Sequence, residues 1–520
     1  MKEKKDTPSG MRLGVIQVLI GVASLFALCN GPSFTDLMAY TVAELGESPS
    51  HGPWMNGTFF SGLGIGVIAS SHLSHRFGRR PIFVSAALGL ALSSFFCALT
   101  INYYLFLGGR AFQGVFSGLL AMTGQGLLIE CYPAELREIP ILLWSMVVIG
   151  PFSIGPAIGG GGKEFWGHEW LSWRSWFWIN GIVAAGAGLG AHLLLPQWAG
   201  RATRERRLDV VGLLLLSVWS FCYAIALCMG DDYEWLISPH IRLLVFFGTF
   251  SLGLLFFWEL GNRHRVVDVT LFLRRNFLIG TFGLAWGFCL FYGLWGTVLV
   301  RTQSTWGFDP LLAGFIYVPM VFISQPLVYA GVRFFHRFDA RILASCNLLV
   351  FALYCLLVSS YDFFRKRSFW LDYVGLQIVQ GIWLGTFLLP LTRIAVAGLS
   401  PAKEAAAVEL SGALRVTLQG WSSPIIGTIL YHRSAFHKWR LVEWLPPNHP
   451  FLSELFSQWA SAGISKEKLL KLLDRQALDR ATVLALDDAF RICAWIFLAM
   501  ALLVWLSRPN PLKTNGYKKR

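Results

Sequence analysis

The sequence predicts an all-α integral membrane protein, and three observations support this fold class. The chain of 520 residues is 55% hydrophobic and only 14% charged, whereas soluble domains carry about 25% charged residues. The apolar residues gather in long segments, and a membrane-spanning helix needs about 20 of them. Arginine and lysine concentrate in alternate connections between these segments, which is the asymmetry that orients membrane proteins. The net charge of +14 therefore indicates orientation in a membrane and not nucleic-acid binding.

Fourteen apolar segments are long enough to cross a bilayer. They extend over 13–40, 53–73, 81–101, 103–127, 139–161, 175–195, 209–229, 239–260, 277–300, 311–333, 341–360, 371–396, 405–430 and 488–507. The first follows the basic stretch MKEKK but is too long for a cleaved signal peptide, so we expect it to be a span. An even number of spans places both termini on the same side of the membrane.

Basic residues place that side in the cytoplasm. Arg79 and Arg80 follow the second segment, and Arg201 begins a basic run after the sixth. Asp231 lies in an acidic connection on the opposite side. The outer run Arg365-Lys366-Arg367 departs from this pattern. We expect a multi-pass protein of the inner (plasma) membrane with both termini in the cytoplasm.

An internal repeat divides the chain. The turn LSHRFGRRPIF at 73–83 follows the second segment, and VRFFHRFDARIL at 332–343 follows the tenth. Two six-helix halves of this kind are typical of transporters with parallel repeats, whose binding site lies between the halves. We therefore expect an N-terminal half over 1–200, two inserted helices over 201–270 and a C-terminal half over 271–520.

The outer segment 431–487 is the one sizeable soluble piece that the sequence predicts. After Ser465, the stretch KEKLLKLLDRQALDRATVLAL has helical periodicity with an apolar stripe. Such a helix is consistent with a lid packed on the outer face. It is equally consistent with a docking surface for a partner protein, and the sequence leaves both alternatives open.

Small residues and proline interrupt the fifth segment, which contains GPFSIGPAIGGGG at 150–162. In water this stretch would form a loop, because an interior glycine costs a helix about 1 kcal/mol and proline about 3. In a bilayer, neighbouring helices satisfy the backbone groups that proline frees, and small residues let helices approach closely. The motif predicts a bent helix pressed against another one through Gly155, Pro156, Gly159 and Gly160.

This motif and the following WRSWFWIN at 173–180 resemble the fourteen-helix drug:proton antiporters of EmrB/QacA type in the major facilitator superfamily. The turn with Arg76, Gly78 and Arg79 resembles the first signature of that family, although His75 replaces its aspartate. Arg110-x-x-Gln113-Gly114 matches the second signature, and the resemblance extends over nearly the whole chain.

The resemblance implies a major facilitator fold that exports amphipathic or aromatic small molecules by alternating access, against inward proton flow. It also implies a periplasmic adaptor and an outer-membrane channel as partners in a cell with two membranes. The chain lacks GxxxxGK[ST], so no ATP site is predicted. We expect no enzyme activity and no cofactor. His72 and His75 have no carboxylate or cysteine nearby in the sequence, so no metal site is predicted.

Two alternatives compete with multidrug efflux. The first is dedicated export or import of one metabolite such as a siderophore. The second is an integral membrane enzyme, which would need His, Asp or Cys residues clustered at one membrane face, whereas this sequence only scatters them.

Proton coupling is assigned from intramembrane charges, which are costly and therefore mark functional sites. The aspartate position of the family falls on Asn30, and the acid here is Asp36. At 1.5 Å per residue, Asp36 and Arg110 both lie roughly 9 Å below the outer boundary. We therefore expect them to meet or share a water-filled pocket, with Asp36 carrying the proton and Arg110 setting its affinity. A static ion pair or an Arg110 side chain that reaches the interface is the alternative, and Glu130 is the next proton carrier.

Aromatic residues and isolated amides suit a site for flat, apolar ligands. Phe288 and Tyr292 lie at helical spacing in the ninth segment, although aromatic side chains also face lipid. Arg415, deep in the thirteenth segment, is suited to an anionic ligand. The expected substrate-binding residues are Asn30, Gln113, Trp286, Phe288, Tyr292, Gln380, Trp383 and Arg415.

Overall fold

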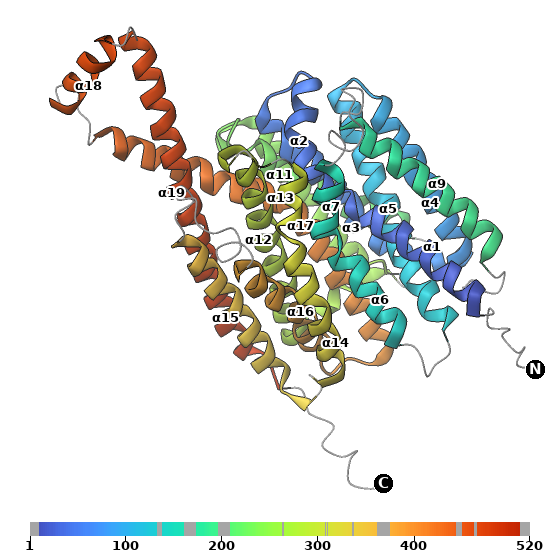
Figure 1. Cartoon of the computed structure of the whole chain (residues 1–520). Coiled ribbons are helices and arrows are strands. Elements are labelled where there is room, and N and C mark those ends of the chain that lie inside the picture. The colour runs from blue at the N-terminus through green and yellow to red at the C-terminus, as the bar shows by residue number, and fades with distance from the viewer. Residues whose placement is uncertain are drawn as a thin grey trace, which may run out of the picture.

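The computed structural model is a bundle of helices (Figure 1). It describes residues 10–132, 138–160, 173–195, 209–262, 265–306, 308, 310–334, 337–360, 375–443, 450–461 and 465–509. These ranges contain helices and turns and no strand, which confirms the predicted all-α class. The outer basic run at 365–367 lies outside the described residues.

Each of the fourteen apolar segments coincides with a helix or a pair of helices. The bounds are α1 Gly10–Cys29, α2 Pro32–Glu44, α3 Gly52–Phe77, α4 Arg79–Leu99, α5 Tyr103–Cys131, α6 Glu138–Ile149, α7 Pro151–Gly160, α9 Arg174–Leu194, α10 Val210–Met229, α11 Pro239–Gly261, α12 Arg275–Trp306, α13 Pro310–Phe315, α14 Val318–Phe334, α15 Ala340–Ser359, α16 Gly375–Val396, α17 Pro401–Glu443, α18 Pro450–Ser461 and α19 Lys466–Leu503. Among the described residues, 11 helices are long and apolar enough to cross a membrane. α3 is not among them, because glycine, serine and histidine lower its hydropathy.

Three of the predicted segments are broken. The first divides into α1 and α2 at Gly31, where an added Cβ would collide with the ring of Phe60. Pro32 then starts α2, a position at which its missing N–H is not needed. The fifth divides into α6 and α7 at Gly150, and the tenth divides into α13 and α14. The helices α2 and α7, which follow the first two breaks, pack against each other.

Glycines bring several helices into backbone contact. On α3 and α5, a Cβ at Gly62 would overlap the carbonyl oxygen of Ala111, and one at Gly114 would overlap that of Phe59. On α7, a Cβ at Gly159 would lie 2.5 Å from the carbonyl oxygen of Ser33 on α2. The glycine-rich motif of the fifth segment therefore packs against α2, with Pro156 inside the helix.

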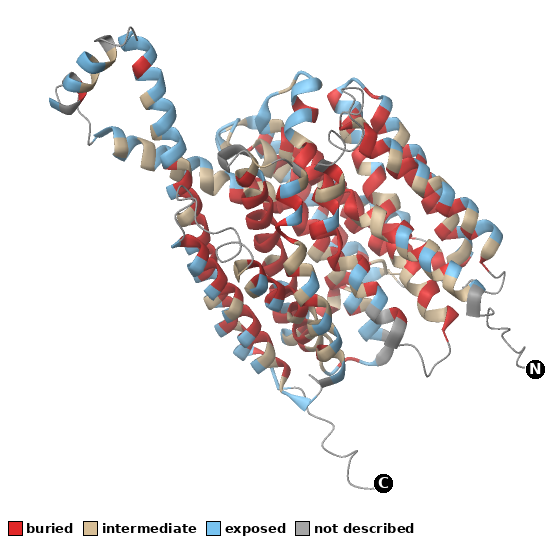
Figure 2. Ribbon diagram, in the orientation of Figure 1, coloured by how far each residue is buried: buried red, intermediate tan, exposed pale blue. Residues whose placement is uncertain are grey.

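Two large apolar cores fill the bundle, and the larger one also includes residues of α3 and α7. α1, α4, α5 and α9 share one core, which includes Phe83 and Leu120. A larger core joins α12, α15, α16 and α19 around Phe351 and Trp383. The pair α10 and α11 packs between them, and α10 contacts both α3 and α17. Figure 2 shows that buried residues concentrate along the centre of the bundle.

The turns between helix pairs are held by ion pairs. Arg79, which follows the positive-φ residue Gly78, pairs with Glu130 at the end of α5. In the related turn before α15, Arg341 Nη2 lies 2.8 Å from Asp339 Oδ2. Hydrogen bonds from the Arg341 side chain hold the pKa of Asp339 below its usual value. Each turn thus fixes an arginine beside a helix end.

A helical hairpin formed by the ends of α17 and α19, with α18 between them, protrudes from the bundle (Figure 1). Ser465 caps α19 as its hydroxyl accepts the N–H of Lys468 at 3.3 Å. The helix predicted after Ser465 does not stop before the last segment, because α19 continues unbroken through 38 residues. At its base, Asp488 binds Arg433 and accepts a hydrogen bond from His437 at 2.7 Å.

Candidate functional site

A buried arginine organises the polar interior of the first helices. Arg110, on α5, is fully buried and donates hydrogen bonds to Gln113 Oε1 at 2.6 Å and Asn56 Oδ1 at 2.9 Å. Its guanidinium carbon also lies 4.4 Å from the ring centre of Phe34 and 4.5 Å from that of Phe59. Neutral acceptor oxygens and two aromatic faces thus hold the charge of Arg110 in place, and no carboxylate pairs with it among the described residues. The alternative in which Arg110 reaches the interface is wrong.

Asn30 lies at the centre of this network. Its carbonyl oxygen accepts from Arg110 Nη2, and its Oδ1 accepts from Gln113 and from Trp176, each at 3.2 Å. The break after α1 places Asn30 there, because the chain leaves the helix at this residue. An amide thus stands where a carboxylate would otherwise face the arginine.

The network continues from α3 to α12. Asn56 Nδ2 donates to Thr35 Oγ1 at 3.2 Å, and that hydroxyl lies 3.2 Å from the hydroxyl of Tyr292. Asn56 and Thr35 belong to helices before the inserted pair, whereas Tyr292 follows it. A chain of hydrogen bonds therefore leads from Arg110 to the second half of the sequence.

Asp36 and Arg110 form no ion pair among the described residues, so the expected direct contact and the alternative of a static ion pair are both wrong. Within the described residues, Asp36 Oδ1 instead accepts a hydrogen bond of 2.7 Å from Gln303 on α12. Its other oxygen, Oδ2, is buried without a hydrogen-bond partner. Phe34 is the residue of α2 that contacts Arg110, and a side chain two positions further along a helix points to nearly the opposite side, so Asp36 contacts α12 instead.

A small cavity of about 60 Å³ lies between helices from both halves of the sequence. Its walls include Trp144 and Phe152 from α6 and α7, and Phe288, Arg415 and Gln419 from α12 and α17. The guanidinium carbon of Arg415 lies 4.6 Å from the ring centre of Phe288. In the part of the chain that the structure describes, Arg415 forms no hydrogen bond or ion pair. Its donors therefore face the cavity, which must widen in another conformation to admit a drug-sized ligand, since such sites occupy roughly 300–1,000 Å³.

Other candidate substrate residues lie away from this cavity. Trp383 is fully buried in an aromatic core, with its ring 4.4 Å from that of Phe351. Trp286 packs with Trp421 beside α10, and Gln380 is buried with its Oε1 unpaired. Tyr292 contacts Phe152 at 6.0 Å between ring centres and so approaches the cavity wall. Phe288 and Arg415 are the predicted residues that line it.

Glu130 lies in a different region from Asp36, as its ion pair with Arg79 shows. Arg76 extends over Phe77 at the end of α3. Four residues escaped the sequence analysis although they act in the site, namely Thr35, Asn56, Gln303 and Gln419. Asn56 and Gln303 are isolated amides in apolar helices, and that signal was available in the sequence.

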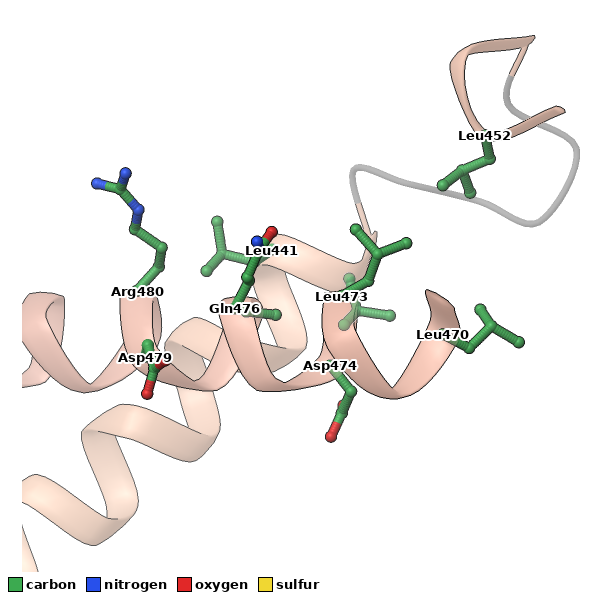
Figure 3. Close-up of a pocket in the computed structure, with 10 residues that line it drawn as sticks. Leu441, Leu452, Leu470, Leu473, Asp474, Gln476, Asp479 and Arg480 are labelled. Carbon is green, nitrogen blue, oxygen red and sulfur yellow. The ribbon is translucent and has the colours of Figure 1, made fainter. Parts of the chain in front are cut away.

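A second candidate surface lies in the protruding hairpin. A groove of about 640 Å³ runs between α17, α18 and α19. Figure 3 shows Leu441, Leu452, Leu470 and Leu473 around this groove, with charged residues of α19 along its rim. Leu470 is exposed, whereas Leu469, next to it, is buried. The groove therefore offers leucine side chains outside the bundle.

Comparison with known proteins adds to this geometry. The model of the Major Facilitator Superfamily matches residues 18–427. The chain is 27% identical over 518 residues to the multidrug export protein EmrB of Escherichia coli K12, covering 99% of both chains. It is also 27% identical over 519 residues to the fatty acid resistance protein FarB of Neisseria gonorrhoeae, covering 98% of both.

Solved structures share the fold. A bacterial homologue of the human lysosomal transporter Spinster, in an inward-facing and unoccupied conformation, matches with a TM-score of 0.63 and 14% identity over 96% of this chain and 97% of that one. A POT family transporter in complex with a thioalcohol-conjugated peptide matches with a TM-score of 0.60 and 13% identity over 95% of each chain.

Proposed function

The chain belongs to the Major Facilitator Superfamily, and from this premise we propose that it is a proton-coupled exporter of amphipathic and aromatic small molecules. Multidrug efflux is supported by the similarity to EmrB proteins over nearly the whole chain. The observation that carries the proposal is the cavity between the halves, where Arg415 lies over Phe288 without a hydrogen-bonding partner among the described residues. A cation and an aromatic face together suit an amphipathic ligand.

The experiment that tests this function uses purified protein in liposomes with a pH-sensitive dye inside. Addition of an amphipathic aromatic compound to one side should move protons in the opposite direction to the compound. Liposomes with Arg415→Gln protein serve as the control, since this variant should lose most of the response. Compound movement without proton movement would contradict coupling while leaving transport intact.

The protein is a multi-pass protein of the inner membrane. The number of its spans and the side on which its termini lie are part of the proposal. Fourteen spans with both termini in the cytoplasm are supported by the basic connections and by the helices at all fourteen segments. In a cysteine-free background, Ser457→Cys on α18 should react with an impermeant reagent in intact cells. Ser400 is exposed before α17, and Ser400→Cys should react only after the cells are permeabilised.

Asp36 is the proposed proton carrier. Its unpaired Oδ2 is a place for the proton, and Gln303 holds the other oxygen from the opposite half. Arg110 influences this site at a distance, through Asn56 and through Thr35, the neighbour of Asp36 in α2. Protonation would weaken the bond from Gln303 and so favour separation of the halves on that side.

A periplasmic adaptor that leads to an outer-membrane channel is the proposed partner. The hairpin extends away from the bundle (Figure 1), and the groove is lined by residues of α17, α18 and α19. This arrangement favours docking over a lid, because a lid would pack on the outer ends of the helices. The charged rim with Asp474, Asp479 and Arg480 suits a polar border around an apolar centre.

Dedicated transport of one anionic metabolite is the second candidate function. It is favoured by Arg415, since a single cation facing a small cavity selects for a carboxylate or phosphate. Competition among unrelated compounds distinguishes the two functions. Mutual inhibition by cationic and anionic aromatics supports multidrug export, whereas inhibition by one anion alone supports the dedicated transporter.

A further inference from the structure

A second cavity, larger than the one between the halves, lies beside the inserted helices. Its volume is about 530 Å³, within the range of roughly 300–1,000 Å³ that ligand sites occupy. Its walls come from α3, α10, α11 and α17, and from the 3-10 turn η4 at Val269–Leu273 with its flanks. The lining is almost entirely apolar, with Trp219, Phe256 and Phe272 among its residues. It shares no lining residue with the cavity that contains Arg415.

The mouth of this cavity is on the lipid-facing surface of the inserted pair. Leu252 and Phe256 line the cavity and yet are 41% and 40% exposed. The outer face of α11 continues the apolar surface, with Phe250 and Phe257 exposed by 55% and 75%. Hydrocarbon chains of the bilayer therefore adjoin an apolar opening, and a ligand needs no passage through water to enter.

One end of the cavity is next to a basic surface. Val267, Val269 and Phe272 form that end. The connection that carries them ends with Arg274 and Arg275, whose side chains are exposed. Lys403, also exposed, lies 3.9 Å from Asp268 in the same connection. The nearby acids Asp209 and Glu259 are buried beneath this surface. An apolar cavity with cations at one end matches a hydrocarbon chain attached to an anionic group.

We propose that this cavity binds an acyl chain of an anionic phospholipid, whose phosphate lies against Arg274, Arg275 and Lys403. The chain would contact Ile65 and Ile68 of α3 on one side and Leu410 and Leu414 of α17 on the other. A bound lipid thus fills the space between the inserted pair and both halves. Because α3 and α17 belong to different halves, the lipid stabilises one relative position of them.

The glycines of α11 provide a matched pair of variants. A Cβ at Gly253, which lines the cavity, meets no atom within 4 Å, and neither does a Cβ at Gly261. Both glycines are exposed on the same helix, and Gly261 does not line the cavity. Gly253→Phe should fill the mouth of the cavity without a clash, whereas Gly261→Phe adds the same ring elsewhere.

Native mass spectrometry of delipidated protein with added lipid tests the proposal. With dioleoylphosphatidylglycerol, the unaltered protein and Gly261→Phe should each retain one lipid through a detergent wash that removes the others. Gly253→Phe should retain at least ten times less of this lipid. The double variant Arg274→Gln, Arg275→Gln should lose the preference for phosphatidylglycerol over phosphatidylcholine.

Equal retention by Gly253→Phe and the unaltered protein would overturn the proposal. Tighter retention of sodium oleate than of either phospholipid would also overturn it, because the ligand would then be a free fatty acid. If Gly253→Phe fails to fold, fluorescence provides the same test. Phosphatidylglycerol with bromine atoms on its chain should quench the unaltered protein more than Trp219→Phe, and equal quenching would overturn the proposal.

Discussion

The hydroxyl of Tyr292 on α12 lies 3.2 Å from the hydroxyl of Thr35 on α2, and this contact joins the two halves of the transporter. Asp36, the next residue of α2, accepts a hydrogen bond from Gln303, which lies further along α12. Beside the cavity, Ser145 on α6 donates to Gln325 on α14 at 2.9 Å. These polar contacts join the halves in addition to the packing of α3 on α17 and of α7 on α13, and each of them can be removed separately.

Removal of the Gln303 side-chain amide should favour separation of the two halves beside α2. In Gln303→Leu, the carboxylate of Asp36 loses a hydrogen bond, which for a charged group contributes about 1.5–3 kcal/mol. A further cavity of about 290 Å³ lies between α2, α12 and α17, and Thr35 and Ser423 line it. We expect roughly a tenfold or greater increase in the labelling rate of Ser423→Cys. Thr302→Val is the matched control, since Thr302 binds only the backbone of its own helix. Equal labelling in both variants would show that the Gln303 contact does not hold the halves together.

Asp36→Asn should abolish proton-driven accumulation while ligand binding and folding persist. The amide keeps the shape of the carboxyl group and still accepts the bond from Gln303, but it does not titrate. Accumulation in liposomes with an imposed pH gradient measures the effect. Glu130→Gln, which breaks the ion pair with Arg79, should keep the gradient-driven component. If Glu130→Gln lost gradient-driven accumulation and Asp36→Asn kept it, the proton carrier would be Glu130 at the end of α5.

Gly114→Ala should lower the melting temperature strongly, whereas Gly108→Ala should not. Both residues lie on α5, but a Cβ at Gly114 would overlap the carbonyl of Phe59 and one at Gly108 meets nothing within 4 Å. Overpacking of this kind costs about 1–3 kcal/mol or more, because the neighbour is backbone. Thermal unfolding in detergent measures both variants. Similar melting temperatures would mean that α3 and α5 are not in contact.

Arg415→Gln should weaken binding of an anionic aromatic compound by more than tenfold and that of its neutral ester far less. The expected loss corresponds to a charge-assisted bond in a water-poor cavity, about 1.5–3 kcal/mol. Arg415→Lys should restore part of the affinity, since it keeps the charge but not the planar fork. Isothermal titration in detergent gives the affinities. An equal loss for acid and ester would instead indicate that Arg415 only supports Phe288.

Charges introduced into the leucine groove of the hairpin should lower drug resistance in cells but leave transport in liposomes unchanged. Leu470→Asp with Leu473→Asp places charges where Figure 3 shows apolar side chains. Leu478→Asp is the control, because Leu478 is exposed on α19 outside the groove. We expect drug resistance to fall only in the double variant, with transport in liposomes unchanged in both. Loss of transport in liposomes would mean that the groove stabilises the fold.

The sequence identified buried polar residues better than it predicted their contacts. A rise of 1.5 Å per residue led us to expect that Asp36 and Arg110 meet, but it gives no side-chain direction, and the break at Gly31 and Pro32 resets the helical phase. Arg110 was found because a charge in an apolar helix is conspicuous. The spacing of aromatic residues did not distinguish Trp383, in a core, from Phe288, on a cavity wall. Both environments bury rings, and only packing against other helices separates them.

α17 is one helix of 43 residues, about 64 Å long at 1.5 Å per residue, and so roughly twice the thickness of a bilayer core. It carries Arg415 in the cavity and Leu441 in the outer groove, with Pro424 between them as the natural place to flex. On the proposed function, a partner bound in the groove holds one end of the helix that carries Arg415, the proposed ligand-binding cation. A tilt of α17 imposed from outside would then move Arg415, so assembly with the partner would change the affinity for the transported compound as well as the place of its release.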